Sequence, residues 1–153
     1  MVNDSVMTAL LEFRRKRNWE QFHKPKELAA ALSIEASELQ EVFQWKTEEE
    51  VARLLSSPSR EKVLDEIADI AIVLSYLCHD LGIDLNAAVL SKLKELFEAH
   101  PGPAPVQVRF LSSNGVTPLE VGSFRVDANR SLIEELKSLL GTGAARVERI
   151  ATS

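Results

Sequence analysis

Apolar side chains recur every three or four residues over five stretches of the first hundred residues, which is the spacing of helices with one buried face. Capping residues mark several helix ends, because Thr47 and Glu50 can form a capping box and Gly82 suits a C-terminal stop. The predicted helices run from about Asp4 to Arg17, from Pro25 to about Phe43, over a short stretch after Thr47, from Ser57-Pro58 to Gly82, and from Asp84 past Leu96.

The pattern changes after His100, where the proline-rich segment 101–105 predicts a linker. Apolar and polar residues alternate over 106–110, as in a half-buried strand. Asn114-Gly115 indicates a hairpin, and Pro118 predicts that the second strand starts late. The remaining predicted elements are that second strand, through Val121 and 124–126, a sixth helix capped by Ser131 with Glu134 and ending at Gly141, and a third strand at 147–150.

These elements predict an all-α bundle of about five helices over residues 1–100, the linker at 101–105, and a small α+β appendage over 106–153. A chain of 153 residues is long enough for one ordinary domain with such an appendage. Its hydrophobic fraction of 45% is sufficient for a real core. The single cysteine, Cys78, lies in an apolar helical run and is expected to be a buried thiol.

The net charge of −5 argues against binding of polymeric nucleic acid, because phosphate backbones need a basic face. A small nucleotide remains possible as a ligand, since a bound cation can supply positive charge locally. The longest apolar stretch, 67–78, is interrupted by Asp69 and is too short to span a bilayer. The first nine residues do not have the pattern of a signal peptide, so we expect a cytoplasmic protein without membrane contact.

Two pairs of carboxylates stand out in the helical region. Glu35 falls in the apolar stripe of the second helix, and Glu38 follows one turn later. Glu66 and Asp69 are also three residues apart, on the most apolar helix of the chain. Residues three apart share a helix face, so each helix is expected to offer a carboxylate pair to the interior. One such pair is common on solvated helices and alone indicates little. The presence of a second pair on an apolar helix favours a metal-binding site.

Four carboxylates in a partly dry site repel one another strongly unless a cation compensates their charge. Oxygen ligands favour hard cations, which predicts Mg²⁺, with Mn²⁺ as an alternative. No histidine or cysteine lies within helical reach of either pair, which argues against zinc. The predicted metal ligands are Glu35, Glu38, Glu66 and Asp69.

The motif Glu35-x-x-Glu38, followed on the next long helix by Glu66-x-x-Asp69, is similar to the metal motif of the all-α nucleotide pyrophosphohydrolases, the MazG-like superfamily. Three flanking segments resemble its dCTP pyrophosphatase branch, and the resemblance covers about 10–101. These segments are Arg17-Asn18-Trp19-Glu20-Gln21-Phe22-His23, Phe43-Gln44-Trp45-Lys46 and Leu90-Ser91-Lys92.

The resemblance implies hydrolysis of a dCTP-like nucleoside triphosphate to the monophosphate and pyrophosphate, with the four carboxylates as catalytic residues and magnesium between them and the phosphates. It also implies substrate contacts by Trp19 and Trp45 to the base, by His23 through a hydrogen bond, by Lys46, and by Lys92 to a phosphate. From residue types alone, the tryptophans would be core or interface residues, His23 a surface histidine and Lys92 a snorkelling lysine.

The end of the fifth helix departs from the family pattern. Where the family has an asparagine and then arginine, tyrosine and proline, this chain has Leu96, Ala99, His100 and Pro101. The family uses that asparagine near metal and phosphate, so the departure bears on substrate choice and rate. Arg109 or Arg125 of the appendage, or residues of a neighbouring subunit, are candidate replacements.

Two alternatives to a dCTP pyrophosphatase follow from these observations. Within the superfamily, a dUTP-type or phosphoribosyl-ATP-type pyrophosphatase is possible, although the motifs around Trp19 and Trp45 count against both. Outside catalysis, the missing asparagine favours a helical module that keeps the metal site as a structural or sensing element.

The fourth helix also predicts assembly, because it is apolar on almost every side. Such a helix must be covered all round, which a single small bundle does not easily achieve. We therefore expect a homo-oligomer, a tetramer by preference and a dimer next, as the family resemblance also implies. Coverage of this helix by the appendage of the same chain is the alternative.

Overall fold

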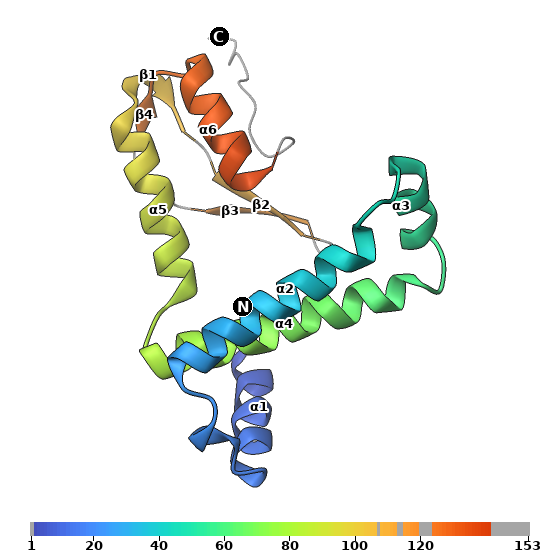
Figure 1. Ribbon diagram of the computed structural model, residues 1–153. Coiled ribbons are helices and arrows are strands. Elements are labelled where there is room, and N and C mark those ends of the chain that lie inside the picture. Colours follow the sequence, from blue (N-terminus) through green and yellow to red (C-terminus); the bar gives the residue numbers. More distant parts are fainter. Residues whose placement is uncertain (1, 107, 113–114, 120–123, 142–153) are drawn as a thin grey trace. The chain divides into compact units, whose positions relative to one another are not determined.

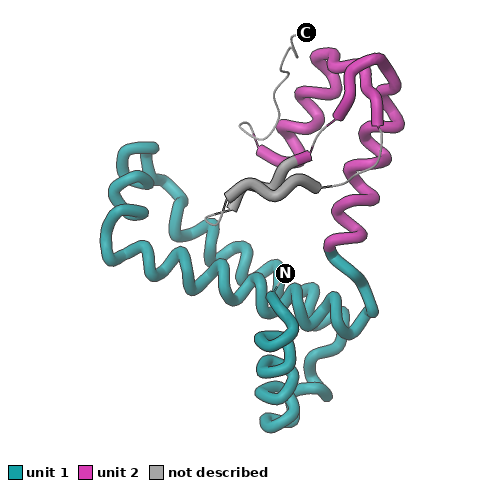
Figure 2. The backbone as a smooth tube through the Cα atoms, turned by 180° about the vertical axis from the view of Figure 1, so that it is seen from behind, with its two compact units in different colours: residues 1–85 teal, residues 86–153 magenta. Residues whose placement is uncertain are grey.

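The computed structural model describes residues 2–106, 108–112, 115–119 and 124–141. The chain divides into two compact units, Met1–Leu85 and Asn86–Ser153, which Figure 2 distinguishes by colour. Within the described residues the chain is mostly helical, so the predicted all-α class with a small α+β appendage is confirmed. No helix in these ranges is both long and apolar enough to cross a membrane.

The first unit is entirely helical (Figure 1). Its two longest helices, α2 and α4, lie side by side and pack more extensively than any other pair of elements. The buried side chains of this unit include Leu28 of α2 and Val63, Tyr76 and Cys78 of α4, which confirms the expected buried thiol. The elements are α1 (Asp4–Lys16), the 3₁₀ turn η1 (Trp19–Gln21), α2 (Pro25–Phe43), α3 (Glu48–Leu55) and α4 (Arg60–Leu81).

Local signals in the sequence explain most helix ends in this unit. Thr47 and Glu50 form the predicted capping box of α3, and Gly82 ends α4 in the left-handed conformation at φ 63°. The predicted start of α4 at Ser57-Pro58 is wrong, because α4 begins at Arg60. The preceding residues form turns instead, in which the Arg60 N–H donates to Ser57 O at 3.0 Å.

The second unit combines two helices with two small antiparallel ribbons. Strand β1 pairs with β4, and β2 pairs with β3. Its core consists of Leu93, Phe97, Val126 and Leu132. Most of helix α5 (Leu85–Ala99) belongs to this unit, followed by β1 (Pro101–Pro105), β2 (Val108–Ser112), β3 (Gly115–Leu119), β4 (Arg125–Val126) and α6 (Arg130–Leu140).

Residues 101–105, predicted as a linker, instead form strand β1. The prolines at every second position are tolerated because each strand of a two-stranded ribbon has one edge that needs no N–H donor. Gly102 is required where β1 meets the chain after β4, since a Cβ there would lie 2.2 Å from the Asp127 nitrogen. The division between the units also falls after Leu85 and not near residue 100, because Leu93 and Phe97 of α5 pack in the second core.

Three further predictions for this unit differ from the structure. The hairpin's second strand does not start late, since β3 begins at Gly115 and includes Pro118, again at the free edge of a two-stranded ribbon. Asn129, not Ser131, caps α6 by accepting a hydrogen bond from the Leu132 N–H at 3.0 Å. Val121 and the third strand predicted at 147–150 lie outside the described residues.

The core of the second unit yields a stability prediction. Leu132 is only 1% exposed, so Leu132→Ala should lower the free energy of unfolding by about 2–5 kcal/mol. Leu139 on the same helix is 47% exposed, so Leu139→Ala should change it by less than about 0.5 kcal/mol. Urea unfolding followed by circular dichroism measures both, and equal losses in the two variants would contradict this core.

Candidate metal and base-binding site

Packing of α2 against α4 brings three of the predicted ligands together. One carboxylate oxygen from each of Glu35, Glu38 and Glu66 lies within 4.8 Å of the other two. Glu35 and Glu66 are partly buried at the contact between the helices, whereas Glu38 is exposed. The expected placement of carboxylates from two helices at one point is therefore observed for these three residues.

Asp69 lies next to this cluster without belonging to it. Its side chain is exposed, and it is not among the three carboxylates whose oxygens lie within 4.8 Å of one another. Its charge nevertheless helps to raise the pKa of Glu35 and of Glu66, so it contributes to the same negative field. The structure thus places Asp69 at the edge of the site.

The electrostatics of the cluster show the repulsion that the sequence predicts. Partial burial is the largest cause of the raised pKa of Glu35, followed by the charges of Glu38 and Asp69. The pKa of Glu66 is raised in the same direction, first by desolvation and then by Glu38 and Asp69. Glu35 and Glu66 are therefore harder to ionise, first because they are partly desolvated and then because their neighbours are negative.

The donor set fits a hard divalent cation. Magnesium binds oxygen at about 2.0–2.1 Å, so oxygens that share one ion lie between about 3 and 4 Å apart. The three carboxylate oxygens, which lie within 4.8 Å of one another, are close to this spacing. Among the described residues, the group of possible ligands contains neither histidine nor cysteine, so the site does not resemble a zinc site.

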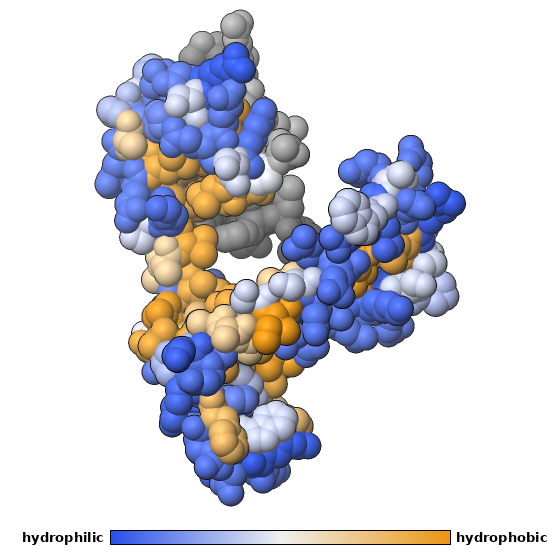
Figure 3. Space-filling view, viewed as in Figure 1, coloured by the Kyte–Doolittle hydropathy of each residue, from blue (hydrophilic) through white to orange (hydrophobic). Residues whose placement is uncertain are grey.

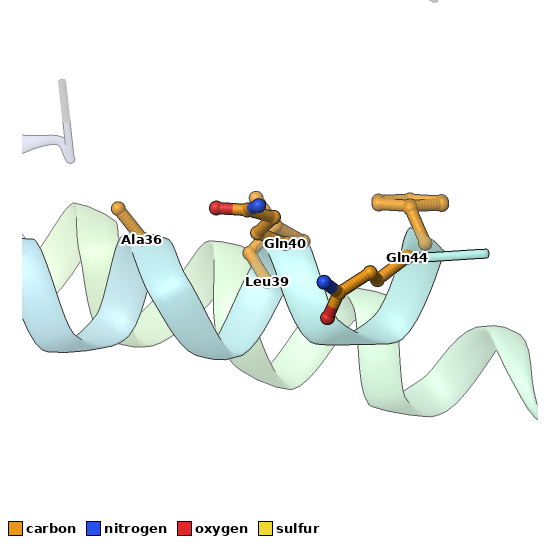
Figure 4. A pocket seen from close by; sticks show the side chains of 5 residues that line it. Ala36, Leu39, Gln40 and Gln44 are labelled. Atoms are coloured by element: carbon orange, nitrogen blue, oxygen red, sulfur yellow. The ribbon is translucent and has the colours of Figure 1, made fainter.

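A shallow groove lies along the C-terminal half of α2 (Figure 4). It has a volume of about 480 Å³ and a largely apolar lining. The groove occupies the stretch of helix between Glu35 and Trp45, and its lining residues are Ala36, Leu39, Gln40, Phe43 and Gln44.

The two tryptophans lie beyond opposite ends of α2. Trp45 follows the C-terminal end, is 92% exposed and has a left-handed backbone with φ 64°, so it is not a core residue of this chain. Lys46 beside it is also exposed. Trp19 precedes the N-terminal end, in η1, and is 40% exposed.

His23 continues the aromatic cluster that begins at Trp19. The two rings have centroids 5.6 Å apart, and the Trp19 ring meets Phe13 of α1 edge to face at the same distance. His23 is partly buried and not a plain surface histidine. Burial lowers the pKa of His23, and the positive charge of Arg14 lowers it further, so both disfavour the protonated ring.

Lys92 lies on α5, in the second unit. Its side chain is exposed, and its Nζ is 3.6 Å from the Glu95 carboxylate in a surface ion pair. Such pairs contribute little to stability, so this ammonium is available to another anion.

Sequence reasoning missed an ion pair in the first unit between the buried Arg14 and the more exposed Asp80. Arg14 is 6% exposed and contacts Asp80 at 2.8 Å. The one available signal was that Arg14 lies one turn after Leu10 in the apolar stripe of α1. Its partner is 66 residues away in the sequence, and no local pattern identifies it.

Comparison with known proteins places the chain in a family. The MazG-like family matches residues 30–104, which contain the whole carboxylate cluster. A pyrophosphatase from Archaeoglobus fulgidus has a similar structure, with a TM-score of 0.59 and 36% identity, covering 65% of this chain and 92% of that chain. The chain belongs to the MazG-like family.

Curated relatives of this MazG-like chain confirm the predicted branch. It is 45% identical over 83 residues to dCTP pyrophosphatase 1 of Bos taurus and of Homo sapiens, over 54% of this chain and 49% of each relative. The corresponding protein of Rattus norvegicus is 38% identical over 91 residues, covering 59% of this chain and 54% of that relative. The matched region of this chain thus spans about half the length of these relatives.

The departure from the MazG-like pattern at the end of α5 has a structural explanation. Leu96 packs against the core of the second unit, and the His100 Nε2 lies 3.0 Å from Glu135 of α6. These positions therefore hold the appendage together. Of the two candidate replacements, Arg125 is exposed and donates to the Pro103 carbonyl, and the side chain of Arg109 lies outside the described part of the chain.

The repulsion in the cluster predicts how the stability of the metal-free protein depends on pH and on the number of carboxylates. A raised pKa of Glu35 means that the folded state holds the carboxyl proton more tightly than the unfolded state does. Proton binding therefore stabilises the fold below about pH 4.5, and this stabilisation is lost as the pH rises through the folded pKa. Glu38→Gln should therefore raise the midpoint of thermal unfolding in a chelator at pH 7, and the gain should vanish near pH 4.

The control for this prediction is Glu27→Gln. Glu27 is an exposed carboxylate in the first turn of α2, where its charge favours the helix, so its loss should lower the midpoint slightly. A gain of the same size in both variants would show a general charge effect and would contradict the cluster.

Proposed function

We propose that this protein is a metal-dependent nucleoside triphosphate pyrophosphohydrolase that converts a dCTP-like nucleotide and water to the monophosphate and pyrophosphate. The observation that carries the proposal is the convergence of Glu35, Glu38 and Glu66 from two packed helices. The names of the relatives support the reaction class, since the matched proteins are a pyrophosphatase and dCTP pyrophosphatases.

Glu35, Glu38 and Glu66 would hold magnesium, with manganese as an alternative, and Asp69 would add a fourth carboxylate at the edge of the same face. The bound cation would compensate the charge of the phosphates and lower the pKa of a water. In the reaction, the water oxygen forms a bond to the α-phosphorus, the α–β anhydride bond breaks, and pyrophosphate leaves. The exposed carboxylates Glu38 and Asp69 are accessible to accept the proton that the water loses.

The field of the cluster makes the cation a requirement. Four negative side chains cannot attract a triphosphate, which is itself a polyanion. The exposed Lys92 would assist at a phosphate, but one cation does not compensate four carboxylates. We therefore expect no measurable affinity for nucleotide in the presence of a chelator.

The base would be recognised by Trp19, His23, Trp45 and Lys46, and the length of α2 separates these residues into two groups. With 19 residues, α2 is about 28 Å long at 1.5 Å per residue. Trp19 with His23 and Trp45 with Lys46 therefore lie much farther apart than the width of a base. We propose that one pocket takes its two tryptophans from different copies of the chain.

Exposed apolar side chains support this assembly. Ile34 of α2 and Leu64 and Ile67 of α4 are large hydrophobic residues that remain exposed in the chain. Figure 3 shows apolar patches over the face of these helices that is turned to the viewer. We propose a homo-oligomer, a tetramer by preference and a dimer next, because a symmetric partner would cover this surface.

The reaction is tested by measuring pyrophosphate release with dCTP and magnesium. Wild type should be active, and Glu38→Gln and Asp69→Asn should lose at least about a hundredfold in kcat/KM, since each removes charge that holds the cation. Circular dichroism of the variants checks the fold. Full activity of Glu38→Gln would contradict the site, and faster turnover of dUTP or phosphoribosyl-ATP would reassign the branch.

A second candidate is a non-catalytic module that binds metal for structure or sensing. The observation that favours it is the use of Leu96 and His100 for packing and for the pair with Glu135, where the resemblance implied residues near metal and phosphate. Magnesium binding by calorimetry with no turnover of any nucleotide would support this candidate over the enzyme.

The shared pocket is tested by mixing two variants that each bind the nucleotide weakly. Trp19→Ala and Trp45→Ala should each weaken apparent affinity for dCTP by about 10- to 100-fold, because stacking on a base is worth about 1–3 kcal/mol. After subunit exchange in a symmetric dimer, about a quarter of the sites should carry both tryptophans and recover wild-type affinity. No recovery after proven exchange would show that the two residues do not share a pocket between copies.

A further inference from the structure

An ion pair between the buried Arg14 and the more exposed Asp80 joins α1 to α4 near the segment that carries Trp19. Arg14 Nη1 and Nη2 donate to the two carboxylate oxygens of Asp80, at 2.8 and 2.9 Å. Among the described residues, Arg14 and Ser75 are the two buried polar side chains. The fork geometry fixes the direction of the guanidinium, which one point charge would not do.

The guanidinium is in turn packed against an aromatic ring. Its central carbon lies 4.8 Å from the centroid of Tyr76, which is a favourable distance for a cation over a ring. The Tyr76 hydroxyl donates to the Leu10 carbonyl at 2.8 Å, so the ring is held at both its face and its tip. Tyr76 is therefore an immobile support for whatever contacts its remaining surface.

That remaining surface supports His23 and, through it, Trp19. The rings of Tyr76 and His23 have centroids 5.5 Å apart, and those of His23 and Trp19 are 5.6 Å apart. Arg17 lies over Phe13 at 3.5 Å and near Trp19 at 5.7 Å, on the other side of the cluster. A continuous series of contacts thus runs from Asp80 through Arg14, Tyr76 and His23 to Trp19.

The position of the segment around Trp19 depends on this series of contacts. None of the three residues of η1 is buried, and Asn18 before it has a left-handed backbone at φ 55°. The N–H groups of Phe22 and His23 bond back to Trp19 O, and the Asn18 N–H donates to Arg15 O, so these hydrogen bonds shape the turn and join it only to the end of α1. The buried His23 Nδ1 has no hydrogen-bond partner, so ring contacts set the orientation of His23.

From these contacts we infer that Arg14 and Asp80 are positioning residues that orient His23 and Trp19 toward the base of the nucleotide through the ring of Tyr76. The inference rests on the proposed function, because it assigns base contacts to Trp19 and His23. It goes beyond that function by naming two residues that touch no substrate and still set its affinity.

A purely stabilising role explains the ion pair less well. Burying the charge of Arg14 costs free energy that a partly exposed partner does not fully compensate, and apolar side chains of similar volume often serve as well or better. What apolar replacements cannot provide is the fixed angle of the guanidinium under the Tyr76 ring. Replacing both charged residues by apolar ones should therefore change the orientation of Trp19 and leave the stability of the protein nearly unchanged.

The test uses the double variant Arg14→Met with Asp80→Leu in the full-length protein. Its matched control is Lys16→Met with Glu12→Leu, which removes an exposed ion pair from the same helix. Orientation is read in a Trp45→Phe background, in which Trp19 is the single tryptophan of the chain, by acrylamide quenching of its fluorescence. Activity is read as KM and kcat for dCTP with both tryptophans present.

The double variant should fold with an unfolding midpoint close to wild type and should show stronger quenching of Trp19. Its KM should rise about tenfold while kcat stays within about twofold, because a displaced base contact weakens binding before it affects the reacting phosphate. The control should match wild type in quenching and KM. Arg14→Lys, which keeps the charge and removes the fork, should behave like the double variant.

Unchanged quenching in a folded double variant would overturn the inference even if wild type hydrolyses dCTP. Changed quenching with an unchanged KM would also overturn it, since Trp19 would then have moved without consequence for the substrate. If wild type hydrolyses no nucleotide, the proposed function fails, and the quenching of Trp19 still decides whether the ion pair positions this ring.

Discussion

Mutual repulsion among the carboxylates on α2 and α4 is the constraint on which the site depends. The packing of these two helices forces Glu35, Glu38 and Glu66 within 4.8 Å of one another, at a cost that appears as the raised pKa values of Glu35 and Glu66. The rest of the first unit provides the apolar contacts that hold the helices together against this repulsion. A cation bound at the cluster would compensate this repulsion, so metal binding would be coupled to folding of this unit.

The second unit changes how the end of α5 is used. Leu96 and His100 pack and pair within this unit, so this end of α5 is part of a second core. In the proposed enzyme, these positions would therefore not be free to contact the substrate, and binding of the phosphates would rely on other cations or on a neighbouring copy.

The sequence predicted what depends on local pattern. Periodic apolar residues, the Thr47–Glu50 capping box and Gly82 predict five helices of the bundle and several of their ends. The two carboxylate pairs at helical spacing predict a cluster, of which the structure brings Glu35, Glu38 and Glu66 together. It did not predict strand β1, because three prolines in five residues resemble a linker unless the partner strand is known. The Arg14–Asp80 pair was missed for the same reason, since its two residues are 66 positions apart.

The backbone of Trp45 carries a consequence for the evolution of this surface. A left-handed conformation at φ 64° costs a residue with a Cβ about 1–2 kcal/mol, and an aromatic ring that is 92% exposed recovers none of it by burial within the chain. Glycine or asparagine would occupy the same turn with less strain. Selection for thermal stability of the isolated chain alone would therefore remove the tryptophan, and only selection for something that the ring contacts would keep it.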